Sequence, residues 1–227
     1  LDPVTLLEEE KFGEKNYWKI WDFLAQTNDS PTYRRMAILA SVGYGKTTLL
    51  KHIALSYAKQ FPVVEEYNAP KLIPILIYLR DLRKMFNDDK ENFPSLPELI
   101  HTHHISRLPA PEKGELSPPE KWAADLLQRG KALVMFDGFD EVAEARRGAV
   151  SEWISEETSR YRRSVFILTS RPPGYEKHFT AEKFETTLYV RAFNDKQRQE
   201  FVHKWYACQE RYDRGGRDTP AVQDTAK

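Results

Sequence analysis

Residues 40–48 have the composition of a loop that binds phosphate groups. They follow a short apolar run that predicts a strand, and they precede a stretch whose apolar residues recur at helical spacing. Glycines let a backbone wrap around phosphates, and the N–H groups at the start of a helix favour negative charge. The loop reads Ala40-Ser41-Val42-Gly43-Tyr44-Gly45-Lys46-Thr47-Thr48.

The side chains of this loop predict a nucleotide and a magnesium ion as ligands. Lys46 would reach the β- and γ-phosphates, and the hydroxyl of Thr47 would coordinate Mg²⁺. Ala40 stands where the strict pattern has glycine, so a Gly-Lys-Thr turn at an ordinary helix start is the alternative. The predicted nucleotide-binding residues are Gly43, Tyr44, Gly45, Lys46, Thr47 and Thr48.

A group of acidic residues follows the apolar run at 132–136. Asp137 comes directly after that run, and Asp140 and Glu141 follow it closely. An aspartate at the carboxyl end of a buried strand holds magnesium in enzymes with such loops. We therefore expect Asp137 to support Mg²⁺, and Asp140 and Glu141 to polarise the attacking water as general base. The alternative is an acidic surface turn after a core strand.

Two arginines are predicted at the same edge of the sheet. Arg171 follows the apolar run at 165–169, and its planar fork suits phosphate oxygens, so we expect it to sense the γ-phosphate. A structural ion pair is the alternative for Arg171. Arg80 ends the run at 72–79, where a pair with the neighbouring Asp81 is favoured over a phosphate contact.

Five apolar runs, separated by helical patterns, would position these motifs. Alternating strands and helices predict an α/β fold, in which helices cover both faces of a parallel five-stranded sheet in three layers. Ligands bind at the carboxyl ends of the strands in such sheets, where the motifs are expected to meet. The predicted strands are residues 35–40, 72–79, 132–136, 165–169 and 186–190.

The composition narrows the classes of partner. Lysine plus arginine and aspartate plus glutamate both number 34, so the chain lacks the basic excess typical of nucleic-acid-binding proteins. The single cysteine, Cys208, excludes an internal disulfide framework and indicates a cytoplasmic setting. No apolar run approaches the length of a membrane span, so no membrane partner is expected.

Three further features have plain interpretations. His101 and His104 have the spacing of a helical metal pair, but a solvated helix face is preferred because no nearby residues complete four ligands. Trp18, Trp21 and Phe23 predict an amphipathic helix packed on the sheet rather than a lid over adenine. ATP is favoured over GTP, because the chain has no Asn-Lys-x-Asp element to bind guanine.

With these motifs, the chain resembles a NACHT domain, within the STAND class of P-loop NTPases. Residues 17–206 are similar to bacterial NACHT proteins, especially those of cyanobacteria. Three blocks carry the resemblance: the glycine-lysine-threonine turn at residues 43–50, Asp137-Gly138-Phe139-Asp140-Glu141, and Thr169-Ser170-Arg171-Pro172.

The resemblance implies a sheet in the order 5-1-4-3-2, with strands numbered along the chain. It also implies ATP and Mg²⁺ binding, slow hydrolysis, and a nucleotide-dependent switch that self-oligomerises when activated. Relatives include animal innate-immune receptors and bacterial anti-phage defence proteins, which signal through flanking domains. By the same resemblance Lys46 and Thr47 bind phosphate and magnesium, Asp137 supports magnesium, and the catalytic residues are Asp140, Glu141 and Arg171.

Three segments are expected along the chain. Residues 1–30 are predicted as a helical segment packed on the core, residues 31–206 as the NACHT P-loop NTPase domain, and residues 207–227 as a linker or the start of a helical domain. We expect weak or absent ATPase activity in this piece alone, because the family's closing domains would follow it. Two alternatives stay open: a non-hydrolysing scaffold acting through protein–protein contacts, and a nucleoside kinase with Arg146, Arg147, Arg162 and Arg163 on its lid.

Overall fold

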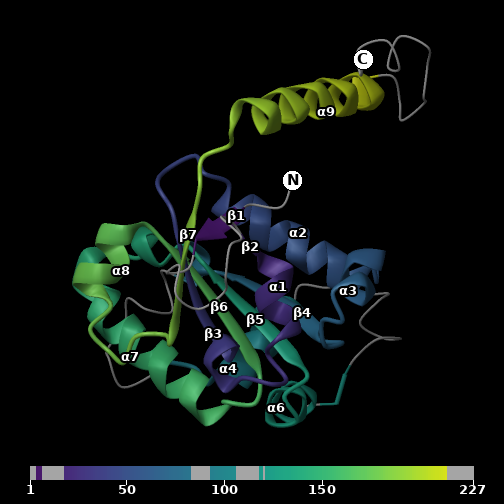
Figure 1. Ribbon diagram of the computed structural model, residues 1–227. Helices are drawn as coiled ribbons and strands as arrows, with labels where there is room; N and C mark the ends of the chain where they lie inside the picture. The colour runs from purple at the N-terminus through teal and green to yellow at the C-terminus, as the bar shows by residue number, and fades with distance from the viewer. Residues whose placement is uncertain (1–3, 7–17, 83–92, 106–117, 120, 214–227) are drawn as a thin grey trace.

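A seven-stranded sheet lies at the centre of the computed structural model, which describes residues 4–6, 18–82, 93–105, 118–119 and 121–213 (Figure 1). The strands lie side by side in the order β2-β1-β7-β3-β6-β5-β4. Their bounds are β1 (Val4–Leu6), β2 (Trp18–Lys19), β3 (Arg35–Leu39), β4 (Ile73–Tyr78), β5 (Ala132–Asp137), β6 (Val165–Ser170) and β7 (Thr186–Val190).

The five strands predicted from the apolar runs form the parallel part of this sheet. β3 pairs in parallel with β6 and β7, and β5 pairs in parallel with β4 and β6. Numbered along the chain, these five strands have the order 5-1-4-3-2, which confirms the expected order. β5 and β6 are buried along their whole length, which is why they appear in the sequence as continuous apolar runs.

Two short antiparallel strands extend the sheet beyond β7. β1 pairs with β7, and β2 pairs with β1. They contain 3 and 2 residues, too few for an apolar pattern to show, so the sequence indicated only a helical segment over residues 1–30. Helix α1 (Ile20–Ala25) follows β2, and its Trp21 and Phe23 are fully buried in the core rather than placed as a lid.

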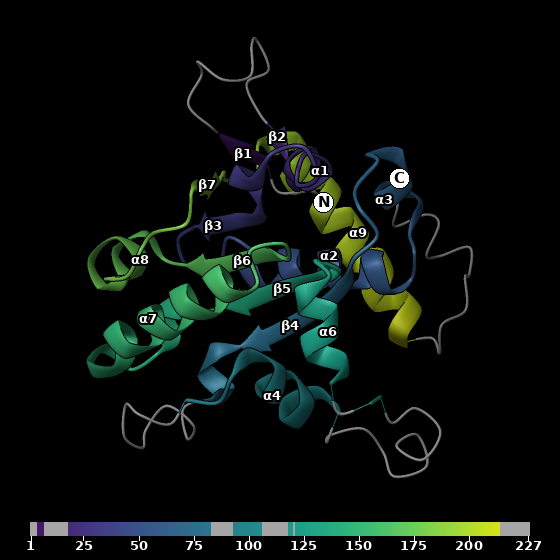
Figure 2. The same ribbon diagram turned by 90° about the horizontal axis from the view of Figure 1, so that it is seen from below.

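Helices cover both faces of the sheet (Figure 2). Successive residues of β3 point to opposite faces, so Met36 and Ile38 join one hydrophobic core while Ala37 and Leu39 join the other. Helices α1, α2 and α3 contribute to the first core, and α4, α6, α7 and α8 to the second. The helices are α2 (Lys46–Ala58), α3 (Pro62–Glu66), α4 (Leu96–Ile100), α6 (Trp122–Gln128), α7 (Glu144–Arg160) and α8 (Pro172–His178).

Four short helical turns connect these elements. Three of them are 3₁₀ turns, and the one after α4 is a π-helical turn. The turns are η1 (Pro31–Arg34), η2 (Leu79–Leu82), η3 (His101–Ile105) and η4 (Phe139–Glu141). η2 and η4 directly follow β4 and β5, so both turns lie at the carboxyl edge of the sheet.

The last helix, α9 (Asp195–Asp213), stands apart from the sheet and its covering helices (Figure 1). It continues past residue 206, so the segment boundary expected there falls inside a helix. Polar residues alone do not end a helix, and the first glycine beyond it is Gly215.

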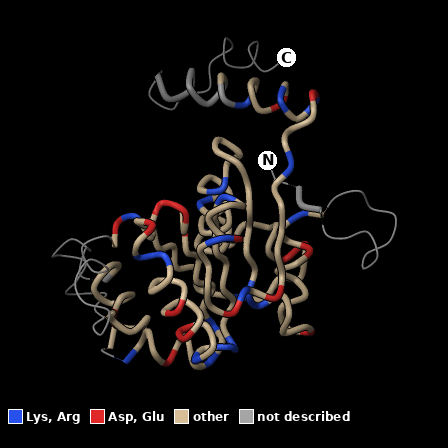
Figure 3. Tube along the Cα trace, turned by 90° about the vertical axis from the view of Figure 1, so that its left-hand side faces the viewer, with Lys and Arg blue, Asp and Glu red and all other residues tan. Residues whose placement is uncertain are grey.

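Basic and acidic residues are interspersed along the described chain (Figure 3). None of the helices in that part of the chain is long and apolar enough to cross a membrane.

Candidate functional site

Three neighbouring strands bring the sequence motifs to one edge of the sheet. β3 and β6 end side by side, with Leu39 paired with Ser170. Just beyond, the N–H of Ala40 donates to the carbonyl of Ser170 at 3.2 Å. β5, which pairs with β6, ends at Asp137. The phosphate loop after β3, the acidic turn η4 after β5 and Arg171 after β6 therefore all start from the same edge of the sheet.

The loop between β3 and α2 has the backbone that its glycines allow. Gly43 and Gly45 have φ angles of +79° and +75°, which glycine adopts at little cost. A Cβ added to either would meet no described atom within 4 Å, so conformation rather than space requires glycine there. Within the described residues no side chain caps α2 at Gly45, which leaves its first N–H groups available to an anion. Tyr44 and Thr48 are exposed.

Ala40 occupies the position of the missing glycine without backbone strain. The described non-glycine residues with left-handed φ angles are Gln60 and Asn68, so Ala40 is not among them. The side chain of Ala40 is buried, and its carbonyl accepts a hydrogen bond from Nζ of Lys46 at 2.8 Å. Lys46 also donates to the carbonyl of Ser41 at 3.1 Å. The amine of Lys46 is thus hydrogen-bonded to the first two residues of its own loop.

Nearby carboxylates and Arg171 change the pKa of the Lys46 amine. Burial lowers the pKa of Lys46, and the negative charge of Asp140 is the largest opposing influence. Arg171 lowers the pKa further, whereas Asp137 and Glu141 raise it. Asp137, Asp140, Glu141 and Arg171 therefore all lie close enough to Lys46 to affect its pKa.

Asp137 is held by threonine hydroxyls from two different elements. Oγ1 of Thr47, in the first turn of α2, donates to Oδ2 of Asp137 at 2.7 Å. Oγ1 of Thr169, in β6, donates to Oδ1 at 2.6 Å and accepts the N–H of Gly138 at 2.9 Å. The buried carboxylate is thereby fixed on both sides. The sequence did not assign a role to Thr169, although a polar residue near the end of an apolar, buried strand was a signal for one.

The hydroxyl of Thr47 and the carboxylate of Asp137 are oxygen ligands of the kind that Mg²⁺ prefers, and they lie 2.7 Å apart, so these two residues would hold the ion. Magnesium usually keeps water and phosphate oxygens in its other positions. The described residues contain no group of three or more His, Cys, Asp or Glu that could hold a metal.

The acidic turn η4 directly follows β5 and is anchored by apolar packing. Gly138 begins it with a φ angle of +79°, and Phe139 is fully buried. The side chain of Asp140 is 11% exposed and that of Glu141 is 43% exposed. The two carboxylates therefore lie near the surface of the sheet edge, with Asp140 the more enclosed.

Both acidic side chains have arginine partners in this structure. Asp140 accepts hydrogen bonds from the backbone N–H of Arg171 and pairs with its Nε, both at 2.9 Å. Glu141 lies 3.6 Å from Nη1 of Arg80, and Nε of the same arginine lies 3.8 Å from Asp81. The structure thus contains the ion pairs considered from the sequence. About half of each arginine side chain is exposed, so an arriving phosphate can compete with the carboxylates for them.

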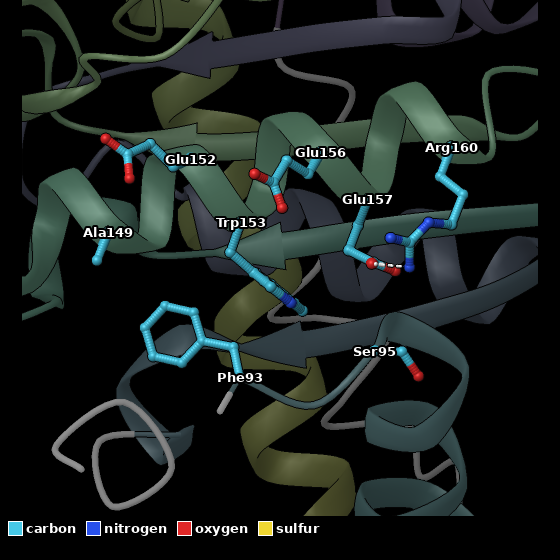
Figure 4. Close-up of a pocket in the computed structure, with 8 residues that line it drawn as sticks. All are labelled: Phe93, Ser95, Ala149, Glu152, Trp153, Glu156, Glu157 and Arg160. Carbon is cyan, nitrogen blue, oxygen red and sulfur yellow. Dashed lines mark hydrogen bonds and ion pairs between the residues drawn. The ribbon is translucent and has the colours of Figure 1, made fainter. Parts of the chain in front are cut away.

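A separate cavity of about 260 Å³ lies beside α7 and contains none of these motifs (Figure 4). Glu157 in its wall accepts the N–H of Leu96 at 2.8 Å and pairs with Nη1 of Arg160 at 2.7 Å. Burial raises the pKa of Glu157, although both contacts oppose this effect. The carboxylate thereby ties the start of α4 to α7, which is a structural role.

The chain has matches among known proteins. The family model described as "NACHT domain" matches residues 34–209, which is most of the chain. An uncharacterised WD repeat-containing protein of Nostoc sp. (strain PCC 7120) is 29% identical over 149 residues. That alignment covers 63% of this chain but only 9% of the relative, so the chain corresponds to a small part of that longer protein.

Proposed function

The chain belongs to the NACHT domain family of P-loop NTPases, and from this premise we propose that it is an ATP-binding switch module that hydrolyses ATP slowly. The observation that carries the proposal is the convergence of the three motifs on one edge of the sheet, where Thr47 donates to Asp137 at 2.7 Å and Arg171 pairs with Asp140 at 2.9 Å. The charges of Asp137, Asp140, Glu141 and Arg171 all act on the amine of Lys46. At such an edge, cationic side chains bind the phosphates, and carboxylates bind magnesium and orient the attacking water.

In this proposal the phosphate loop binds the triphosphate. The N–H groups of the loop and of the first turn of α2 surround the phosphates, and Lys46 exchanges its contacts with Ala40 and Ser41 for phosphate oxygens. Thr47 and Asp137 would hold Mg²⁺, which supplies charge neutralisation for the β- and γ-phosphates when bound. Gly43, Tyr44, Gly45 and Thr48 belong to the same loop and complete its backbone.

The acidic turn is proposed to act on the attacking water. Glu141 serves as general base with Asp140 beside it, and Arg171 moves from Asp140 to the γ-phosphate. The exposure of Glu141, Val42 and Tyr44 supports slow turnover, because electrostatic stabilisation of a transition state is weaker in an open, hydrated site. ATP rather than GTP is proposed because the sequence contains no guanine-binding element.

Steady-state turnover of Mg·ATP by the wild-type chain and by Glu141→Gln tests this proposal. Loss of a general base lowers rates by about 10²- to 10⁴-fold, so we expect at least a hundredfold decrease with nucleotide affinity retained. Glu144→Gln is the matched control, because Glu144 is 75% exposed and pairs with His178 instead. Absence of Mg²⁺-dependent ATP turnover in a longer protein that carries this chain with its flanking domains would contradict the hydrolytic function.

A non-hydrolysing scaffold is the second candidate, and Ala40 motivates it. Ala40 replaces the glycine of the strict pattern, but its backbone has no left-handed φ angle. This observation supports nucleotide binding over the scaffold. If the longer protein folds but neither it nor its Glu141→Gln variant turns over ATP, the scaffold is favoured instead.

The module is further proposed to act within a longer signalling or anti-phage defence protein. The family membership supports this proposal. So does the Nostoc relative, whose name records WD repeats and which aligns with this chain over only 9% of its length. Flanking domains would then close over the nucleotide edge and mediate self-oligomerisation.

A further inference from the structure

Arg147, in the first turns of α7, makes contacts that the sequence did not suggest. Its Nε donates to the carbonyl of Val142 at 2.9 Å, and its Nη2 donates to the carbonyl of Asp140 at 2.7 Å. The two carbonyls lie on either side of Glu141 in the chain. One guanidinium therefore holds the backbone of the acidic turn on both sides of the proposed base.

The contacts that Glu141 itself makes are weaker than the hydrogen bonds from Arg147 to the neighbouring carbonyls. Its ion pair with Arg80 spans 3.6 Å between side chains that are 43% and 52% exposed, and exposed pairs of this kind contribute little stability. The turn's own hydrogen bonds are short-range: the N–H of Glu141 donates to Gly138 at 2.9 Å, and that of Val142 donates to Phe139 at 3.2 Å. Hydrogen bonds from a charged donor are stronger than neutral ones.

The geometry also requires an arginine. Two donors from one planar group reach two carbonyls that lie two residues apart, whereas a lysine ammonium is a single point donor. These contacts engage Arg147 with the turn, so it does not extend from the surface as a nucleoside-kinase lid requires.

We propose that Arg147 is a positioning residue that fixes the acidic turn and so directs the carboxylates of Asp140 and Glu141 toward the nucleotide edge. The catalytic part of this inference rests on the proposed hydrolytic function. The structural part, that Arg147 holds the turn in place, does not.

Hydrogen exchange and kinetics on Arg147→Ala and Arg147→Lys test the two parts separately. Breaking the clamp opens the turn locally, so we expect the amides of Glu141 and Val142 to exchange at least about tenfold faster in Arg147→Ala, with β5 unchanged. Arg147→Lys should restore part of the protection. Arg162→Ala, which removes an exposed arginine just after α7, is the control and should leave exchange unchanged.

In Arg147→Ala the carboxylates of Asp140 and Glu141 would be displaced, which lowers kcat for Mg·ATP. The residues that contact phosphate stay in place, so KM is little affected. We expect kcat of Arg147→Ala to fall by at least about tenfold while KM changes less than about twofold. Unchanged exchange at Glu141 and Val142, or an unchanged kcat, overturns the proposal. If Arg147→Ala does not fold, Arg147→Lys gives the same readouts. A wild-type chain that binds no Mg·ATP contradicts the proposed function instead, and exchange still decides whether Arg147 holds the turn.

Discussion

Thr169 joins β5 and β6 through one buried hydroxyl. It donates to Asp137 and accepts the N–H of Gly138, so both its donor and its acceptor capacity are used. The same carboxylate also receives the hydroxyl of Thr47 from the phosphate loop. A single side chain in β6 therefore sets the orientation of the proposed magnesium ligand relative to the loop that would bind phosphate.

Replacing Thr169 by valine keeps the shape of the side chain but removes these hydrogen bonds. The buried N–H of Gly138 loses its partner, so we expect Thr169→Val to lower the free energy of unfolding by about 1–3 kcal/mol. Urea denaturation measures the change. Thr169→Ser keeps the hydroxyl and is the control, with a smaller loss. A Thr169→Val chain as stable as the wild type would show that these hydrogen bonds do not hold the edge together.

The residues of the site could be found in the sequence, but their partners could not. Lys46, Asp137 and Arg171 stand in short motifs that directly follow apolar runs. The ion pair of Arg171 with Asp140 and the contacts of Arg147 join residues brought together by strand pairing and helix packing. Such geometry depends on register and packing rather than on local spacing, so the sequence left the ion pair of Arg171 as one of two alternatives.

Helix α8 approaches the acidic turn at a glycine. A Cβ added to Gly174 would lie 2.7 Å from the Cβ of Asp140 and 3.0 Å from Oγ of Ser170. Glycine is normally unfavourable within a helix, so its presence here is explained by this close approach. The helix that follows Arg171 thereby packs directly against the residue that Arg171 pairs with.

Gly174→Ala and Gly148→Ala should have opposite effects on stability. Overpacking outweighs the gain in helix propensity at Gly174, so we expect a net loss of roughly 1 kcal/mol or more, with slower ATP turnover. A Cβ at Gly148, within α7, meets Oγ1 of Thr180 at an ordinary 3.8 Å, so the helix gains up to about 1 kcal/mol. Thermal and urea unfolding compare the two variants. A more stable Gly174→Ala chain would contradict the packing described for α8.

The helices and strands were predictable to different degrees. β5 and β6 were visible because burial on both faces makes them continuous apolar runs. β1 and β2 are too short to show a pattern, and their pairing with β7 depends on tertiary structure. The extent of α9 beyond residue 206 was not predicted, because α9 is a largely polar helix that stands apart from the core.

The chain as a whole leaves accessible the carboxyl edge of the sheet, where the nucleotide is proposed to bind. Val42 and Tyr44 are 66% and 43% exposed, and α9 stands apart from the body. An open edge weakens the attraction between the loop and the phosphates relative to a site closed by flanking domains. We therefore expect weak nucleotide binding by this chain and tighter binding within a longer protein.

Calorimetric titration of the chain with Mg·ATP tests the central claim most directly. We expect saturable binding that weakens when Mg²⁺ is chelated, and Lys46→Ala should reduce the affinity by at least about tenfold because a charged contact to phosphate is lost. Lys51→Ala, which removes an exposed lysine from the same helix, should bind as the wild type does. Equal affinities for wild type and Lys46→Ala, or no binding by either, would contradict the account.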